Sequence, residues 1–295
     1  PEVLLGHLAG ETDSIRLGSG AVLLNHYSPF KVAEQFGVLD ALAPGRIDAG
    51  LGRANGSPAA DRALGTSRRV QNPDEDHAEK IEAVVTHLSD DYPDGHPYSE
   101  LTIPRSGAAT PEPWVLGSSP SSATIAGELG LPYCFAAFIR PELATRSFEA
   151  YREQFQPSPL AGGVDAPQGL LAVNAVAADT DEEAARRRAV AEASYKRMQR
   201  GVVGSRPTVE EAIDELGGVP DPTPATLDAG EWPRAISGSP DTLAGLLEQL
   251  TERVGVDEVM IQHIVGDHGD GLRSHELLAD GVGLTQREAH EASRG

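Results

Sequence analysis

The 295 residues predict an α/β fold of parallel strands, and three features of the sequence support it. Apolar runs alternate with longer segments of helical periodicity, as in βαβ units. Several helical segments begin at Ser or Asp, next to Pro or acidic residues, and end at Gly or Pro. No change of composition divides the chain, so a single domain over residues 1–295 is expected. A doubly wound sheet and a closed (β/α) barrel both satisfy this pattern.

Six strands are expected from the apolar runs: residues 15–24, 46–52, 113–119, 131–138, 168–178 and 256–264. A closed barrel of this type needs about eight strands. Residues 1–10 have the pattern of the second half of an amphipathic helix, without a start signal before them. The simplest interpretation places two further strands and a helix upstream of Pro1. We therefore expect a barrel that is incomplete at its N-terminus in this chain.

Helices are expected between the strands. Ser28-Pro29 opens one that closes at Pro44-Gly45, and Asp179-Thr180-Asp181 caps a long helix over residues 181–200. The arginine run within that long helix, residues 186–188, is expected on a solvated face. The remaining helices are expected at residues 74–89, 121–130, 141–155, 240–254 and 275–280.

One segment breaks the alternation. Residues 201–235 are rich in Gly, Pro and Asp, and contain a single short helical pattern at residues 208–216. This composition predicts an irregular insertion, which makes the segment a candidate lid.

The charge of the chain restricts its partners. Lys and Arg number 24 against 45 for Asp and Glu, a formal net charge of −21, and this field disfavours binding to nucleic acid. The lysines are Lys31, Lys80 and Lys196. Acidic surfaces with little lysine suit a salt-rich cytoplasm that screens self-repulsion, so a halophilic source is one hypothesis. An acidic mesophilic protein is the alternative, and full stability without added salt would favour it.

Other classes are disfavoured by what the sequence lacks. No apolar run reaches the roughly 18–20 residues that span a bilayer, and no secretory leader is recognisable, so a cytoplasmic protein without membrane contact is expected. Cys134 is the only cysteine, which excludes an intramolecular disulfide and a multi-cysteine zinc site. The apolar neighbours of Cys134 predict a core residue.

Two loops after strands have the composition of an anion site. GLGRANG (residues 50–56) combines glycines with Arg53, although its spacing departs from the dinucleotide-binding fingerprint. GSSPSSA (residues 117–123) places serine hydroxyls at the start of a helix. Taken singly, the first is also typical of a tight loop with a solvated arginine, and the second of ordinary N-capping. A single phosphate held by both loops explains the pair most economically.

Histidines supply further candidates. His26 follows Asn25 at the end of a strand, where it can act as an acid, a base or a hydrogen-bond donor, or serve a loop without chemistry. His263 and His268 lie with Asp267 and Asp270 after the last strand, a mixture that can ligate a metal. Because no His-x-His or His-Glu-x-x-His spacing is present, a polar loop without metal is the favoured interpretation.

In chain order these segments resemble the luciferase-like monooxygenase family of flavin-dependent oxidoreductases. The resemblance covers nearly the whole chain and is carried by residues 15–56, 114–133, 173–184, 238–261 and 272–279. It implies a TIM-like barrel with an insertion, binding reduced flavin at the carboxyl ends of the strands. The family's acidic-histidine segment at the end of its second strand has no counterpart here, so the resemblance transfers no catalytic base.

The resemblance also implies site residues. Arg53 and the backbone around Asn55 would hold the phosphate of FMN with Ser118, Ser119 and Ser122. The bond between Gly20 and Ala21 corresponds to the family's non-prolyl cis peptide beneath the flavin ring. A small-molecule substrate, a separate flavin reductase as reductant and a homodimer are the partners it implies.

Three other activities remain open at this point. A dehydrogenase or reductase using the deazaflavin coenzyme would share the fold and transfer a hydride without oxygen. A flavin-binding protein without turnover would fit the missing histidine segment. A metal-dependent hydrolase would use His263 and His268.

Overall fold

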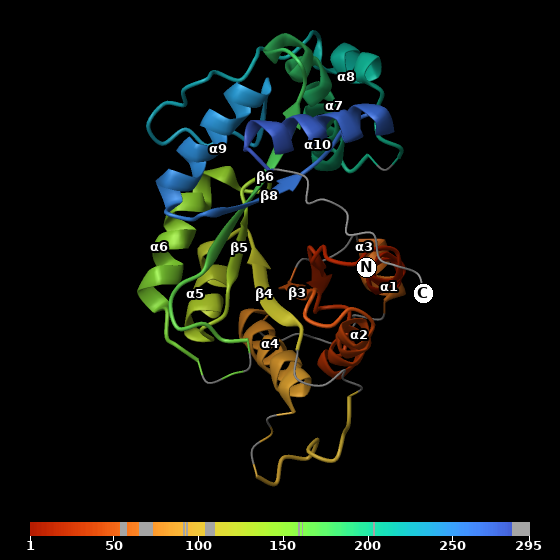
Figure 1. The fold of residues 1–295 in the computed structure, drawn as a ribbon, viewed down its shortest axis with the longest axis vertical. Coiled ribbons are helices and arrows are strands. Elements are labelled where there is room, and N and C mark those ends of the chain that lie inside the picture. Colours follow the sequence, from red (N-terminus) through yellow and green to blue (C-terminus); the bar gives the residue numbers. More distant parts are fainter. Residues whose placement is uncertain are drawn as a thin grey trace, which may run out of the picture. The chain divides into compact units, whose positions relative to one another are not determined.

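The computed structural model describes residues 1–53, 58–64, 73–90, 92, 94–103, 110–158, 160, 162–202 and 204–284 (Figure 1). The chain forms two compact units. The first comprises Pro1–Ala136 and Leu143–Leu171, and the second comprises Ala137–Glu142 and Ala172–Gly295.

Parallel strands form the centre of the first unit. They are β1 (Leu17–Gly18), β2 (Val22–Leu23), β3 (Ile47–Gly52), β4 (Glu112–Gly117) and β5 (Tyr133–Ala136). Their order is β1-β3-β4-β5, and β2 also pairs with β3. The register sets Val22 opposite Leu51 and Leu51 opposite Val115, so the carboxyl ends of β2, β3 and β4 meet at one edge.

Close backbone approach explains a glycine in β3. A Cβ added at Gly50 would lie 1.8 Å from the carbonyl oxygen of Ser19. The Ser19 hydroxyl donates to the Gly50 carbonyl at 2.9 Å, which holds the segment between β1 and β2 against β3. Only glycine allows this spacing.

The helices of this unit are α1 (Glu2–Glu11), α2 (Pro29–Leu42), α3 (Pro58–Ala63), α4 (Pro73–Ser89), α5 (Pro120–Glu128) and α6 (Ala144–Gln154), and a 3₁₀ turn at Pro141–Leu143 precedes α6. The helices α5 and α6 pack together beside β4 and β5 (Figure 1). Phe148 and Tyr151 of α6 form an aromatic core with Tyr133 of β5, in which the Tyr133 and Phe148 ring centroids are 5.8 Å apart in a T-shaped arrangement.

The second unit contains most of β6 (Gly169–Ala177), β7 (Ala235–Gly238) and β8 (Glu258–Gln262), with β7 and β8 both paired to β6. Its helices are α7 (Asp181–Gln199), α8 (Val209–Leu216), α9 (Pro240–Val254) and α10 (His268–Gly281). Thr208 and Glu211 form a capping box on α8, and α8 packs on α7 through a small cluster around Ala189 and Ala212.

The predicted α/β fold of parallel strands is confirmed, with corrections in detail. The run 15–24 is two short strands rather than one, because the chain turns at Ser19–Ala21 between them. The strand β7 was not predicted, since four residues give too little periodicity. The helix α3 was expected as loop, and α10 begins at His268 instead of near residue 275 because Asp267 caps it.

The solvated face expected for the arginine run 186–188 is wrong for Arg188. Arg188 is 8% exposed, and its guanidinium donates to the Thr223 hydroxyl and the Asp221 carbonyl at 2.5 and 2.7 Å. Its Nε lies 3.0 Å from a carboxylate oxygen of Glu192. Arg188 therefore fixes the segment around Asp221 and Thr223 to α7.

Within the described residues, no helix is long and apolar enough to cross a membrane. Cys134 is buried in β5, as its neighbours predict.

Candidate active site

The candidate site lies in the first unit, at the edge where β2, β3 and β4 end. Arg53 directly follows β3, and Ser118 and Ser119 directly follow β4. Because Leu51 pairs with Val115, continuing the register brings Arg53 level with Gly117. The two loops predicted to share one anion therefore start side by side.

The segment between β1 and β2 completes this edge. The Gly20–Ala21 peptide bond is cis, and Gly20 is exposed. The chain then runs along β3, where the Leu24 amide donates to the Gly52 carbonyl at 2.9 Å. The side chain of Asn25 donates to the Arg53 carbonyl at 2.7 Å, which positions the backbone of Arg53. His26 is half-buried in the following turn.

The three predicted serines differ in what they can offer a ligand. Ser119 is the N-cap of α5 and accepts from the Ser122 amide. The Ser122 hydroxyl points inward, because it donates to the Ser119 carbonyl at 2.8 Å and lies 3.2 Å from the hydroxyl of buried Tyr133. Ser118 and Ser119 are half-buried. We infer that α5 offers first-turn amides and the Ser118 and Ser119 hydroxyls, with Ser122 supporting the turn.

Asn55 lies outside the described residues. His77 in α4 is a further candidate that its sequence context did not single out. It is 1% exposed, and neither ring nitrogen has a hydrogen-bond partner among the described residues. Ile81, Val84 and Leu88 continue its face of the helix as buried core, so the spacing alone marks position 77 as core. A histidine among apolar residues was the available signal.

Burial is the main reason that His77 stays neutral. It lowers the pKa of His77 to about 4, with further lowering by the nearby charges of Arg53 and Lys80 and an opposing effect of Asp76. Lys80 itself pairs with Asp76. The side chain of His77 is therefore an uncharged imidazole close to two cationic groups at neutral pH.

This shift predicts a pH dependence of stability. The folded pKa lies below the unfolded value, so the stabilisation is fully present above pH 6.5 and is lost as pH falls towards about 4. From pH 7.5 to pH 5 we expect His77 to account for a loss of about 2 kcal/mol in unfolding free energy. Urea unfolding of wild type and His77→Phe at both pH values measures how much of the pH-dependent loss in unfolding free energy comes from His77. Equal pH-dependent losses in the two proteins would contradict it.

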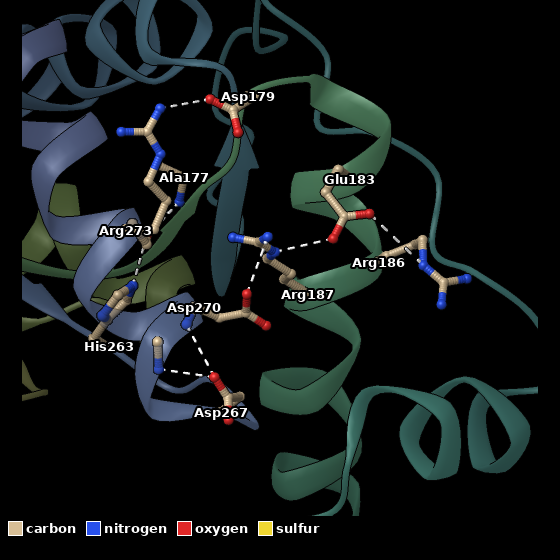
Figure 2. A network of polar contacts seen from close by, with 11 residues as sticks. Ala177, Asp179, Glu183, Arg186, Arg187, His263, Asp267, Asp270 and Arg273 are labelled. Carbon is tan, nitrogen blue, oxygen red and sulfur yellow. Dashed lines mark hydrogen bonds and ion pairs between the residues drawn. The ribbon is translucent and has the colours of Figure 1, made fainter.

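The histidines of the second unit form a different arrangement. His263 Nδ1 lies 3.1 Å from His275 Nε2. On its other side His263 Nε2 lies 2.7 Å from the hydroxyl of buried Ser274, which accepts from the Ala177 amide. Figure 2 shows His263 and Ala177 on either side of this hydroxyl. Burial, followed by the charge of His275, lowers the pKa of His263 to about 4.

The acidic residues that follow β8 serve the fold. Asp267 caps α10, while Asp270 pairs with Arg187 at 3.0 Å (Figure 2). In the part of the chain that the structure describes, no group of three or more His, Cys, Asp or Glu side chains could hold a metal.

The donors at the edge of β2, β3 and β4 fit a phosphate group. They comprise the guanidinium of Arg53 and the first-turn amides of α5, and the imidazole of His77 lies near enough to Arg53 for that charge to lower its pKa. A guanidinium and a helix N-terminus both favour an anion. The exposed backbone at Gly20 leaves room for a planar group beside it.

The chain is similar to known proteins over most of its length. The model of the family described as luciferase-like monooxygenase matches residues 1–258. The N-acetyl-S-alkylcysteine monooxygenase of Bacillus subtilis is 35% identical over 296 residues, covering 97% of this chain and 84% of that protein.

Solved structures of monooxygenases and related proteins are also similar to this chain. The apo form of MsnO8 shares 38% identity and a TM-score of 0.82, covering 97% of this chain and 83% of that one. The oxygenating constituent of 3,6-diketocamphane monooxygenase from Pseudomonas putida, solved with FMN, shares the fold at a TM-score of 0.62 and 22% identity, covering 96% and 83%. On the extent of the family match and of these identities, the chain belongs to the luciferase-like monooxygenase family.

Proposed function

We propose that this protein is a flavin-dependent monooxygenase that uses reduced FMN and oxygen to oxygenate a small organic substrate. The observation that carries the proposal is the joint placement of Arg53 and the N-terminus of α5 at one edge of the sheet. The oxygenase chemistry is supported by family membership and by a relative named as a monooxygenase. The deazaflavin-dependent alternative has support only from the shared fold.

Each part of the edge has a distinct task in this proposal. Arg53 binds the phosphate oxygens as a fixed cation, and Asn25 holds the Arg53 backbone in place. The amides of α5 donate to the same phosphate. Gly20 and Ala21 present bare backbone to the flavin ring. His26, in the turn beside Asn25, is the candidate proton carrier or substrate donor at this edge.

The cofactor supplies the redox chemistry, because reduced flavin can reduce oxygen and pass one oxygen atom to a substrate. The protein orients the ring and excludes water around it. A separate flavin reductase would supply the reduced cofactor. We further propose that the parallel sheet is the larger part of a TIM-like barrel.

Anaerobic titration with reduced FMN in molar KCl tests the proposal. We expect saturable binding by wild type and a loss of about 10- to 150-fold in affinity for Arg53→Ala, since a charge-assisted contact is removed. Arg146→Ala, an exposed arginine of α6, is the matched control and should bind as wild type does. A folded wild type that binds the deazaflavin coenzyme and not FMN would overturn the proposal.

A further inference from the structure

The imidazole of His77 carries an unmet hydrogen-bonding requirement. A neutral imidazole has one N–H donor and one acceptor nitrogen, and both His77 nitrogens are buried without a partner among the described residues. Buried polar groups are nearly always hydrogen-bonded, because leaving one unpaired destabilises the fold. An apolar side chain would fill this position on α4 without that penalty, as Ile81 and Val84 do further along the same face. The ring therefore calls for a partner beyond the described residues.

The surroundings of His77 indicate that this partner is an anion. Arg53 at the end of β3 lies close enough for its charge to act on the ring, as does Lys80 one turn further along α4. Asp76 is the acidic group that faces them, and it is engaged by Lys80. His77 also lies in the second turn of α4, whose amino end is the positive end of the helix dipole. A negatively charged group that accepts a hydrogen bond suits this setting.

We propose that His77 donates a buried hydrogen bond to the same phosphate that Arg53 binds, as a positioning residue for the flavin phosphate. The inference rests on the proposed function, because it takes the phosphate of FMN as the ligand. A neutral donor adds a directed contact without increasing the positive charge beside Arg53 and Lys80. It would also favour a cofactor that carries a terminal phosphate over one that lacks it.

The test compares FMN with riboflavin, which has the same ring without the phosphate. Dissociation constants of both reduced flavins are measured for wild type, His77→Phe, His77→Gln and His87→Phe. We expect His77→Phe to weaken FMN binding about tenfold while riboflavin binding stays the same. His77→Gln keeps an N–H donor and should recover part of the loss.

His87→Phe is the matched control. His87 is also buried in α4, but its Nδ1 contacts the Tyr92 hydroxyl, so it has a partner within the protein. We expect the ratio of the FMN and riboflavin constants to match wild type in this variant. Circular dichroism establishes that each variant is folded.

The outcomes separate this inference from the proposed function. If wild type binds FMN and His77→Phe keeps the wild-type ratio, the role of His77 is overturned while the flavin site stands. If wild type binds no flavin, the change in melting temperature on adding inorganic phosphate shows whether an anion site is present. A shift that depends on both His77 and Arg53 would keep the anion site and overturn the flavin function. No shift with phosphate would overturn both.

Discussion

Gly50→Ala is expected to reduce the unfolding free energy by about 3 kcal/mol or more, because the new methyl group has no room. Its Cβ would lie 1.8 Å from the Ser19 carbonyl oxygen and 3.2 Å from Leu116 Cδ1. The strand β3 or the segment before the cis peptide must then move. Since that segment borders the proposed flavin site, FMN affinity should fall together with stability. Urea unfolding and FMN titration of the same preparation measure both effects.

The control for this variant is the same substitution in an open position. Gly245 lies inside α9, and a Cβ there meets nothing within 4 Å. Gly245→Ala should therefore stabilise the protein by about 0.5–1 kcal/mol through helix propensity alone. If the two alanine variants show similar unfolding free energies, the close approach at Gly50 does not constrain the sheet.

Arg188→Met is expected to cost about 2–4 kcal/mol of unfolding free energy. The methionine fills much of the volume but donates nothing, so the Asp221 carbonyl loses its 2.7 Å contact and Thr223 loses a donor. Thr223 also accepts from the Ser237 amide in β7 at 2.9 Å, so we expect the substitution to destabilise β7 as well. Hydrogen exchange should show faster opening around residues 221–237 in the variant.

Arg186→Met removes an arginine from the same helix without those contacts. Arg186 is 41% exposed and lies 3.9 Å from Glu183 and 3.5 Å from Glu210. Exposed pairs contribute little, so this variant should stay within about 0.5 kcal/mol of wild type. Equal losses at positions 186 and 188 would contradict the buried role of Arg188.

The sequence alone predicts the order of most strands and helices along the chain. Strands β3, β4 and β6 are six or more residues long and strongly apolar, so their periodicity and the caps between them identify them. Strands β1 and β2 are two residues each, and no pattern of that length separates them. Arg53 and the serines follow β3 and β4, as their motifs predict. The two loops start side by side because the carboxyl ends of neighbouring parallel strands lie at one edge of the sheet.

The roles of buried polar side chains could not be predicted from the sequence in the same way. Arg188 stands in a run of three arginines that looks uniformly polar, and its partners Asp221 and Thr223 are 33 and 35 residues away in sequence. His77 belongs to no sequence motif, and only the fold brings it close enough to Arg53 for that charge to lower its pKa. Ser122 was predicted as a ligand donor, yet Tyr133 and the Ser119 carbonyl take its hydroxyl. Such assignments depend on contacts between distant segments.

Cys134, at 2% exposure in β5, is a chemical probe of how often that strand opens to solvent. Because it is the sole thiol, a thiol-modifying reagent has a single target in the chain. In the native state that sulfur is shielded, so each modification event counts one opening of the strand that carries it. When the reagent is concentrated enough for labelling to outpace reclosing, stopped-flow or mass-spectrometric labelling rates equal the rate at which this part of the first unit opens to solvent. The same experiment in varied salt would follow how strongly the acidic surface governs that rate.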